Sequence, residues 1–102
     1  MPSVRENLIA AKALIDTPEK WGKGAMSRAG ALCSVGALGV ASCGGPFGWR
    51  YEDLYELQKA LPKAWRWNQV ASFNDDDETT HADIMALFDR AIAASSNEEI
   101  GV

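Results

Sequence analysis

Cys33 and His81 are the residues of this sequence best suited to nucleophilic chemistry. Cys33 is expected at the start of a helix of small residues, where the helix dipole lowers the pKa of a thiol. His81, the only histidine, directly follows the expected helix cap Thr80. With Asn74 or Asp75 to orient the imidazole ring, these residues would form a Cys-His hydrolase or transferase site.

The same residues also have a structural interpretation, which we favour over the enzyme. Cysteine is among the residue types most often buried, and a lone histidine beside a helix cap is typically a neutral, hydrogen-bonded structural residue. Cys43 lies ten residues after Cys33, which is too far for a disulfide across an intact helix. Both thiols are therefore expected to be free and buried.

A run of acidic residues ahead of the last expected helix raises the question of a metal site. Asp75, Asp77 and Thr79 would fit the first ligand positions of a calcium loop. Position six would then be Thr80 where glycine is required, and position twelve Ala86 where glutamate is required. We predict no metal ligand, because acidic residues before a helix commonly complement its positive N-terminal end.

The acidic run is instead a candidate contact surface for a protein partner. Tryptophan is enriched at protein interfaces, although in a small domain it also covers the rim of the core. The residues predicted to bind the partner are the acidic loop and two nearby tryptophans: Asp75, Asp76, Asp77, Glu78, Trp65 and Trp67.

The distribution of charge argues against direct binding of nucleic acid. The formal net charge is −4, with nine basic and six acidic residues up to residue 70, but one basic and eight acidic residues after it. A chain that binds phosphates needs a basic stripe, and the acidic final third opposes that. The glycines between residues 36 and 45 match neither a phosphate loop nor a dinucleotide motif, so no cofactor is expected.

Hydrophobic periodicity predicts an all-α domain, a compact bundle of about four helices. The helices are expected near residues 3–16, where Ser3 and Glu6 form a capping box, and near 33–43, 50–61 and 80–94. Two alternatives stand for residues 25–32, an extended passage or a small β-hairpin. The tail from about residue 95 is expected to fray.

Within residues 50–61 the pattern predicts which side of the helix is buried. Tyr51, Leu54, Leu57 and Leu61 recur at helical spacing and are expected to face the core. The charged residues between them are expected to face solvent: Glu52, Asp53, Glu56 and Lys59.

Composition places all 102 residues in one globular domain. No apolar run reaches the roughly 20 residues that a membrane-spanning helix needs. The first residues lack the layout of a secretory signal, so we expect a cytoplasmic protein without membrane contact.

Several motifs together resemble a domain-of-unknown-function family found in bacteria and their phages. The motifs are residues 11–21, Gly24-Ala25, Arg28, Cys33 to Leu38, Phe73-Asn74-Asp75, Thr80-His81 and Leu87 to Ile92. The sequence departs from the usual pattern at Phe73, where the family typically has tryptophan, and in the short stretch between Arg28 and Cys33. The resemblance implies a compact helical fold and implies no activity.

The leading functional hypothesis is a small non-enzymatic accessory or regulatory protein that binds another protein. The resemblance suggests that a phage or mobile element encodes it, and one form of the hypothesis is an inhibitor of a host system. The alternative is the Cys-His enzyme built on Cys33 and His81.

Overall fold

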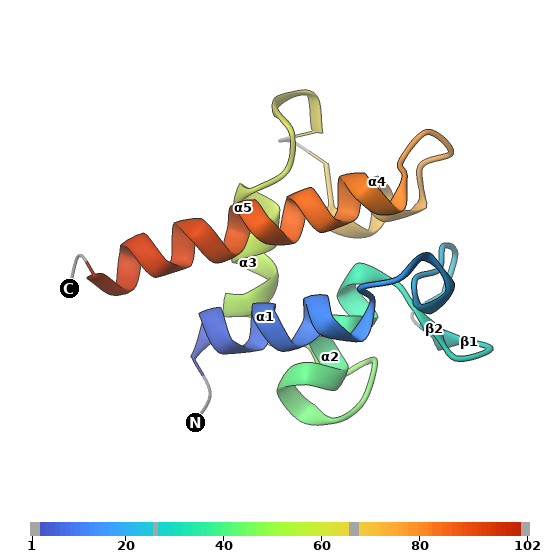
Figure 1. Cartoon of the computed structure of the whole chain (residues 1–102), viewed down its shortest axis with the longest axis horizontal. Helices are drawn as coiled ribbons and strands as arrows, with labels where there is room; N and C mark the ends of the chain where they lie inside the picture. The colour runs from blue at the N-terminus through green and yellow to red at the C-terminus, as the bar shows by residue number, and fades with distance from the viewer. Residues whose placement is uncertain (1–2, 26, 66–67, 101–102) are drawn as a thin grey trace.

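The structure is a computed structural model that describes residues 3–25, 27–65 and 68–100. The expected all-α fold is confirmed, and a small antiparallel sheet accompanies the helices (Figure 1). In chain order the elements are α1 (Val4–Leu14), a 3₁₀ turn (Pro18–Lys20), β1 (Ser27–Arg28), β2 (Ala31–Leu32), α2 (Ser34–Cys43), α3 (Tyr51–Lys59), a 3₁₀ turn (Lys63–Trp65), α4 (Val70–Asp75) and α5 (His81–Ile100).

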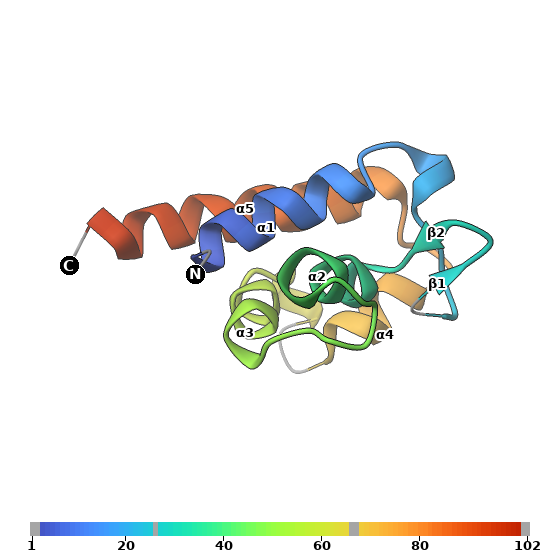
Figure 2. The same ribbon diagram turned by 90° about the horizontal axis from the view of Figure 1, so that it is seen from below.

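The helices form two layers around one apolar core. Figure 2 shows α1 and α5 side by side and running in opposite directions, with α2, α3 and α4 against one side of the pair. The core is formed where these layers meet, and it includes fully buried side chains from four helices: Leu8, Leu38, Leu57, Leu87 and Phe88. None of the helices in the described part of the chain is long and apolar enough to cross a membrane.

The N-terminus of α1 is fixed by the predicted capping box. The Ser3 hydroxyl accepts a hydrogen bond from the Glu6 backbone N–H at 3.1 Å, and the Glu6 carboxylate accepts one from the Ser3 N–H at 3.5 Å. These two bonds satisfy backbone donors that a helix start otherwise leaves without partners.

The small residues of α2 allow close packing on several sides. Cys33 is the N-cap of α2, and Gly44 ends the helix in the left-handed conformation, with φ of 80°. A Cβ at Gly39 would lie 2.5 Å from the backbone oxygen of Gly45. The loop after α2 therefore passes directly over the helix, and only glycine leaves room for it.

Residues 27–32 form the β-hairpin, which was one of the two alternatives. Ser27 pairs with Leu32 and Arg28 with Ala31. The two turn residues, Ala29 and Gly30, both have positive φ, at 51° and 86°. Positive φ at both positions is typical of the tight turns whose twist matches that of a hairpin.

The predicted orientation of α3 is partly wrong. Leu57 and Leu61 are buried as expected, but Asp53 is 0% exposed, Glu56 is 8% exposed and Tyr51 is 69% exposed. Polar contacts explain the difference, because Asn7 Nδ2 donates to Asp53 Oδ2 at 3.1 Å. A carboxylate with a hydrogen-bond partner can occupy a buried position that the pattern assigned to solvent.

Two helix boundaries after residue 69 also differ from the prediction. Residues 70–75 form α4, so Asn74 and Asp75 belong to a helix and not to the acidic loop. The helix α5 continues to Ile100, beyond the expected end at residue 94, because no glycine or proline interrupts the sequence before Gly101.

The two thiols are free, but only one is buried. Cys33 is buried as predicted, whereas Cys43 is exposed. Cys43 is the last residue of α2, immediately before the helix ends at Gly44, and the core therefore does not cover it.

Candidate functional site

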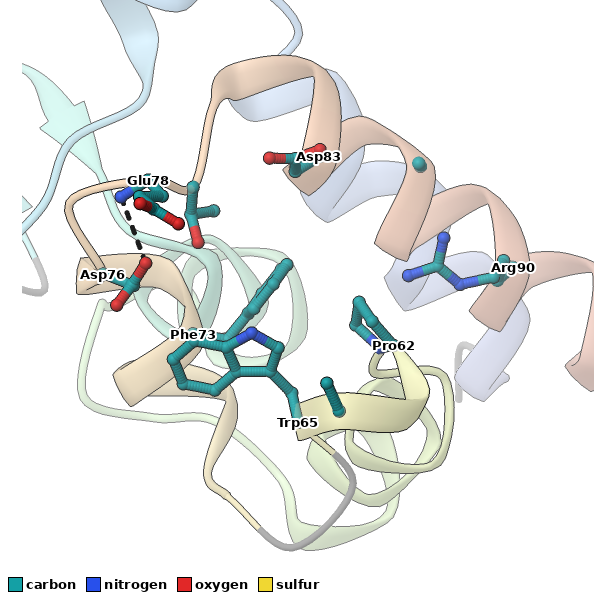
Figure 3. Close-up of a pocket in the computed structure, with 10 residues that line it drawn as sticks. Pro62, Trp65, Phe73, Asp76, Glu78, Asp83 and Arg90 are labelled. Atoms are coloured by element: carbon teal, nitrogen blue, oxygen red, sulfur yellow. Dashed lines mark hydrogen bonds between the residues drawn. The ribbon is translucent and has the colours of Figure 1, made fainter.

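A hollow of about 480 Å³ opens between α4, α5 and the turn before α4. We call it the acidic hollow because three carboxylates and one guanidinium line it (Figure 3). Its charged residues are Asp76, Glu78, Asp83 and Arg90, and the others are Pro62, Ala64, Trp65, Phe73, Thr79 and Ala86.

Two aromatic rings form one side of the acidic hollow. Trp65 ends the 3₁₀ turn before α4, and Phe73 lies on α4. Their ring centroids are 5.4 Å apart and the ring planes meet at 71°, an edge-to-face contact of the kind that aromatic pairs prefer. Phe73 is 4% exposed and belongs to the core, whereas Trp65 is only partly buried. The core thus holds Phe73 in place, and Phe73 in turn packs against Trp65.

Local hydrogen bonds hold two of the three carboxylates. Asp76 Oδ2 accepts from the Glu78 backbone N–H at 3.0 Å, which tightens the turn between α4 and α5. Asp83 Oδ2 accepts from the Thr80 N–H at 2.9 Å, while the Thr80 hydroxyl accepts from the Asp83 N–H at 3.2 Å. Thr80 therefore caps α5 as predicted, and this cap orients Asp83.

The Glu78 carboxylate differs from the other two. Within the described ranges, it makes no hydrogen bond or ion pair, and the residue is exposed. Arg90 lies on the opposite side of the hollow, where its Nε donates to the Ala60 carbonyl at 2.9 Å. Glu78 is thus the acidic group of the hollow most available to a ligand.

The structure brings together three of the residues predicted to bind a partner, namely Trp65, Asp76 and Glu78. Asp75 serves another purpose, because its Oδ1 accepts from the Gly24 N–H at 2.9 Å. Asp77 is exposed and does not line the hollow. Trp67 falls outside the described residues, and the binding role of all these residues stays a prediction.

The sequence reasoning missed several lining residues, and the aromatic or charged ones among them are Phe73, Asp83 and Arg90. The signal for two of them was available, because residues seven apart lie on the same face of a helix. Asp83 and Arg90 have this spacing on α5. Phe73 had been noted only as a substitution for tryptophan.

Asn74, a candidate catalytic residue, is a fully buried structural centre. Its side-chain oxygen accepts hydrogen bonds from the Ser34 backbone N–H at 3.0 Å and the Ser34 hydroxyl at 2.7 Å. Its Nδ2 donates to the Gly22 carbonyl and to Asp75 Oδ1, each at 3.0 Å. These partners occupy both polar atoms of the amide, so Asn74 holds α2 and α4 together.

The surroundings of Cys33 and His81 suit structural roles. Burial raises the pKa of the Cys33 thiol, although hydrogen bonds from the Gly36 and Val35 backbone oppose this. Cys33 Sγ accepts from the Gly36 N–H at 3.3 Å, as an N-cap does. His81 Nε2 lies 2.7 Å from the Ile15 carbonyl oxygen, and because a carbonyl only accepts, Nε2 carries the proton. The Cys-His enzyme stays an untested alternative.

The described ranges contain no group of three or more histidine, cysteine, aspartate or glutamate side chains placed to hold a metal ion.

The fold and the hollow define a small all-α domain with one β-hairpin and an acidic, partly aromatic cavity. The chain belongs to the family of unknown function DUF6197, whose sequence model matches residues 1–94. The match confirms the resemblance to a family of unknown function. No curated protein and no solved structure matches the chain.

Proposed function

We propose that this chain is a small non-enzymatic accessory or regulatory protein and that the acidic hollow receives a basic side chain of a protein partner. The observation that carries the proposal is the placement of Trp65 beside Asp76, Glu78 and Asp83 in one hollow. A ring face attracts a cation through its quadrupole, and carboxylates attract it through their charge.

Arginine suits this hollow better than lysine. Its planar guanidinium stacks on an aromatic face and presents several N–H donors at once, whereas an ammonium is a more strongly hydrated point charge. Trp65 offers the ring, and the Glu78 carboxylate offers acceptors that no described contact uses. The three carboxylates outnumber the single guanidinium of Arg90, so the hollow keeps an excess of negative charge.

Narrower forms of the proposal rest on the sequence alone. These are a regulator encoded by a phage or mobile element, which the resemblance suggests, and an inhibitor of a host system, which the acidic run from Asp75 to Glu78 suggests. Cytoplasmic localisation and the lack of direct nucleic-acid binding are likewise predictions from the sequence.

The proposal is tested by comparing partners of the wild type with those of two matched variants. Glu78→Gln removes a charge from the hollow without breaking a described hydrogen bond. Asp77→Asn removes the same charge from the same loop, but Asp77 does not line the hollow. Each full-length chain is immobilised, and proteins captured from a bacterial lysate are quantified by mass spectrometry.

We expect the wild type and Asp77→Asn to retain the same partner and Glu78→Gln to retain several-fold less of it. Equal recovery with all three chains, or no recovery with any of them, would contradict the proposal. Circular dichroism of the variants confirms that each is folded.

A further inference from the structure

A second hollow adjoins the acidic one. It measures about 500 Å³, and its charged residues include Lys59, Lys63 and Arg90, so we call it the basic hollow. Pro62 and Arg90 line both hollows. The two hollows therefore adjoin, and we call the pair the groove, with an acidic half and a basic half.

One stripe of α5 runs the length of this groove. Asp83 and Ala86 line the acidic half, Arg90 lines both halves, and Ala94 lines the basic half. Spacings of three and four residues place these positions on one face of a helix. Ala86, which lies between Asp83 and Arg90 on this face, carries only a methyl group.

The length of the stripe defines the separation of the two charges. Asp83 and Arg90 are seven positions apart, which at 1.5 Å per residue is about 10 Å along the helix axis. In the extended polyproline II conformation, three residues span about 9 Å and complete one turn, so side chains three positions apart lie on the same side of the segment. Such a segment lying along the groove would thus meet opposite charges with side chains three positions apart.

The basic half has cationic groups available to a ligand. Lys59 pairs with Glu56 at 3.0 Å, which neutralises one charge. No carboxylate in the described ranges pairs with Lys63 or Arg90. Glu56 also lines this half, and its buried Oε2 makes no hydrogen bond with any described residue. The basic half therefore presents two cations, Lys63 and Arg90, that no described carboxylate neutralises.

We propose that the groove binds an extended segment of the partner that carries a basic and an acidic side chain three positions apart. The basic side chain enters the acidic hollow, so this inference rests on the proposed function. The acidic side chain pairs with Lys63 and Arg90 in the basic hollow. Opposite charges in the two halves make the groove selective for such a pair over a segment with one kind of charge.

The test uses capped synthetic peptides and the full-length, isotope-labelled chain. One peptide carries arginine alone, a second carries arginine and glutamate three positions apart, and a third carries the same two residues next to each other. Dissociation constants come from chemical-shift titrations by NMR at low salt. Variants Lys63→Gln and Arg28→Gln lose the same charge, but Arg28 lies exposed on the hairpin.

We expect the second peptide to bind about threefold to fivefold more tightly than the first, which is the effect of one exposed ion pair. Lys63→Gln should reduce this gain in affinity, whereas Arg28→Gln should leave it unchanged. High salt should also reduce the gain, because it screens the ion pair. The third peptide should show no comparable gain.

Two outcomes would overturn the inference and leave the proposed function standing. One is equal affinity of the first and second peptides, and the other is an equal gain in affinity from the third peptide. In both outcomes, Glu78→Gln still weakens binding of the arginine peptide. If the arginine peptide does not bind, or binds equally well to Glu78→Gln, the proposed function itself fails and the inference fails with it.

Discussion

The indole Nε1 of Trp21 donates a hydrogen bond of 2.7 Å to Oδ1 of Asn74, although 53 positions separate the two residues. The same oxygen accepts from the backbone and side chain of Ser34. One buried amide thus fixes the segment before the hairpin, the start of α2 and the end of α4. Because Phe73 precedes Asn74 directly, this contact also positions one side of the acidic hollow.

Replacing Asn74 with alanine should destabilise the fold strongly. The change leaves the Trp21 indole N–H, both Ser34 donors and the Gly22 carbonyl without this partner. A single buried polar group without a partner costs about 1–3 kcal/mol, so we expect a loss of about 3 kcal/mol in the free energy of unfolding. Urea unfolding followed by circular dichroism measures it.

The exposed Asn68 provides the control for that experiment. Asn68→Ala should change the free energy of unfolding by no more than about 0.5 kcal/mol. If both substitutions had equal, small effects, the central role of Asn74 would be wrong.

Gly39→Ala should also destabilise the protein, for a steric reason. The added Cβ would lie 2.5 Å from the Gly45 oxygen and 2.8 Å from the Pro46 carbonyl, and both are backbone atoms that cannot rotate away. We expect a loss of about 1–3 kcal/mol, as for other overpacked sites. Gly45→Ala is the matched control, because nothing lies within 4 Å of a Cβ there. A thermal unfolding midpoint that is unchanged in Gly39→Ala would refute this packing.

Asp53 should make stability depend on pH. Burial raises the pKa of its carboxyl above the ordinary value of 3.8, and Arg50 and Asn7 only partly oppose this. The folded protein then holds a proton that the unfolded chain has released. The contribution of Asp53 to stability is therefore greatest in acid and falls as the pH rises through the folded-state pKa.

Asp53→Asn removes this titration. The free energy of unfolding of the variant should therefore rise relative to the wild type between about pH 4 and about pH 7. Asp77→Asn serves as the control and should not change the slope. A constant difference between Asp53→Asn and wild type across this range would show that burial of Asp53 does not control stability.

The two cysteines should react at very different rates. In the native protein, iodoacetamide should modify the exposed Cys43 readily and the buried Cys33 only after unfolding, because alkylation requires an accessible thiolate. Peptide mass spectrometry identifies the modified residue, and Cys43→Ser isolates Cys33. Fast alkylation of native Cys33 that slows in His81→Ala would favour the Cys-His enzyme instead.

The sequence predicted most reliably those features that depend on neighbouring residues. The Ser3 and Glu6 capping box and the Thr80 cap each require only a few adjacent positions. The orientation of α3 was missed because Asn7 and Asp53 are 46 positions apart. A helical pattern alone gives no sign that a distant amide will accompany a carboxylate into the core.

The candidate site was predictable only in part, for the same reason. The acidic run and Trp65 were visible in the sequence, and the structure places Asp76, Glu78 and Trp65 around one hollow. α4 was missed because its six residues contain too few apolar positions to establish a period. Without α4, the sequence could not show that Phe73 lies beside Trp65 or that Asn74 is buried.

The most direct test of the central claim is the NMR signal of the Trp65 indole N–H during titration with a capped glycine-arginine-glycine peptide. Trp65→Phe assigns the signal. We predict a saturable shift in the wild type and in Asp77→Asn, and binding about twofold to fivefold weaker in Glu78→Gln, as for the loss of one exposed charge pair. A Trp65 signal that does not move, or that moves identically in Glu78→Gln, would contradict the claim that the acidic hollow binds a basic side chain.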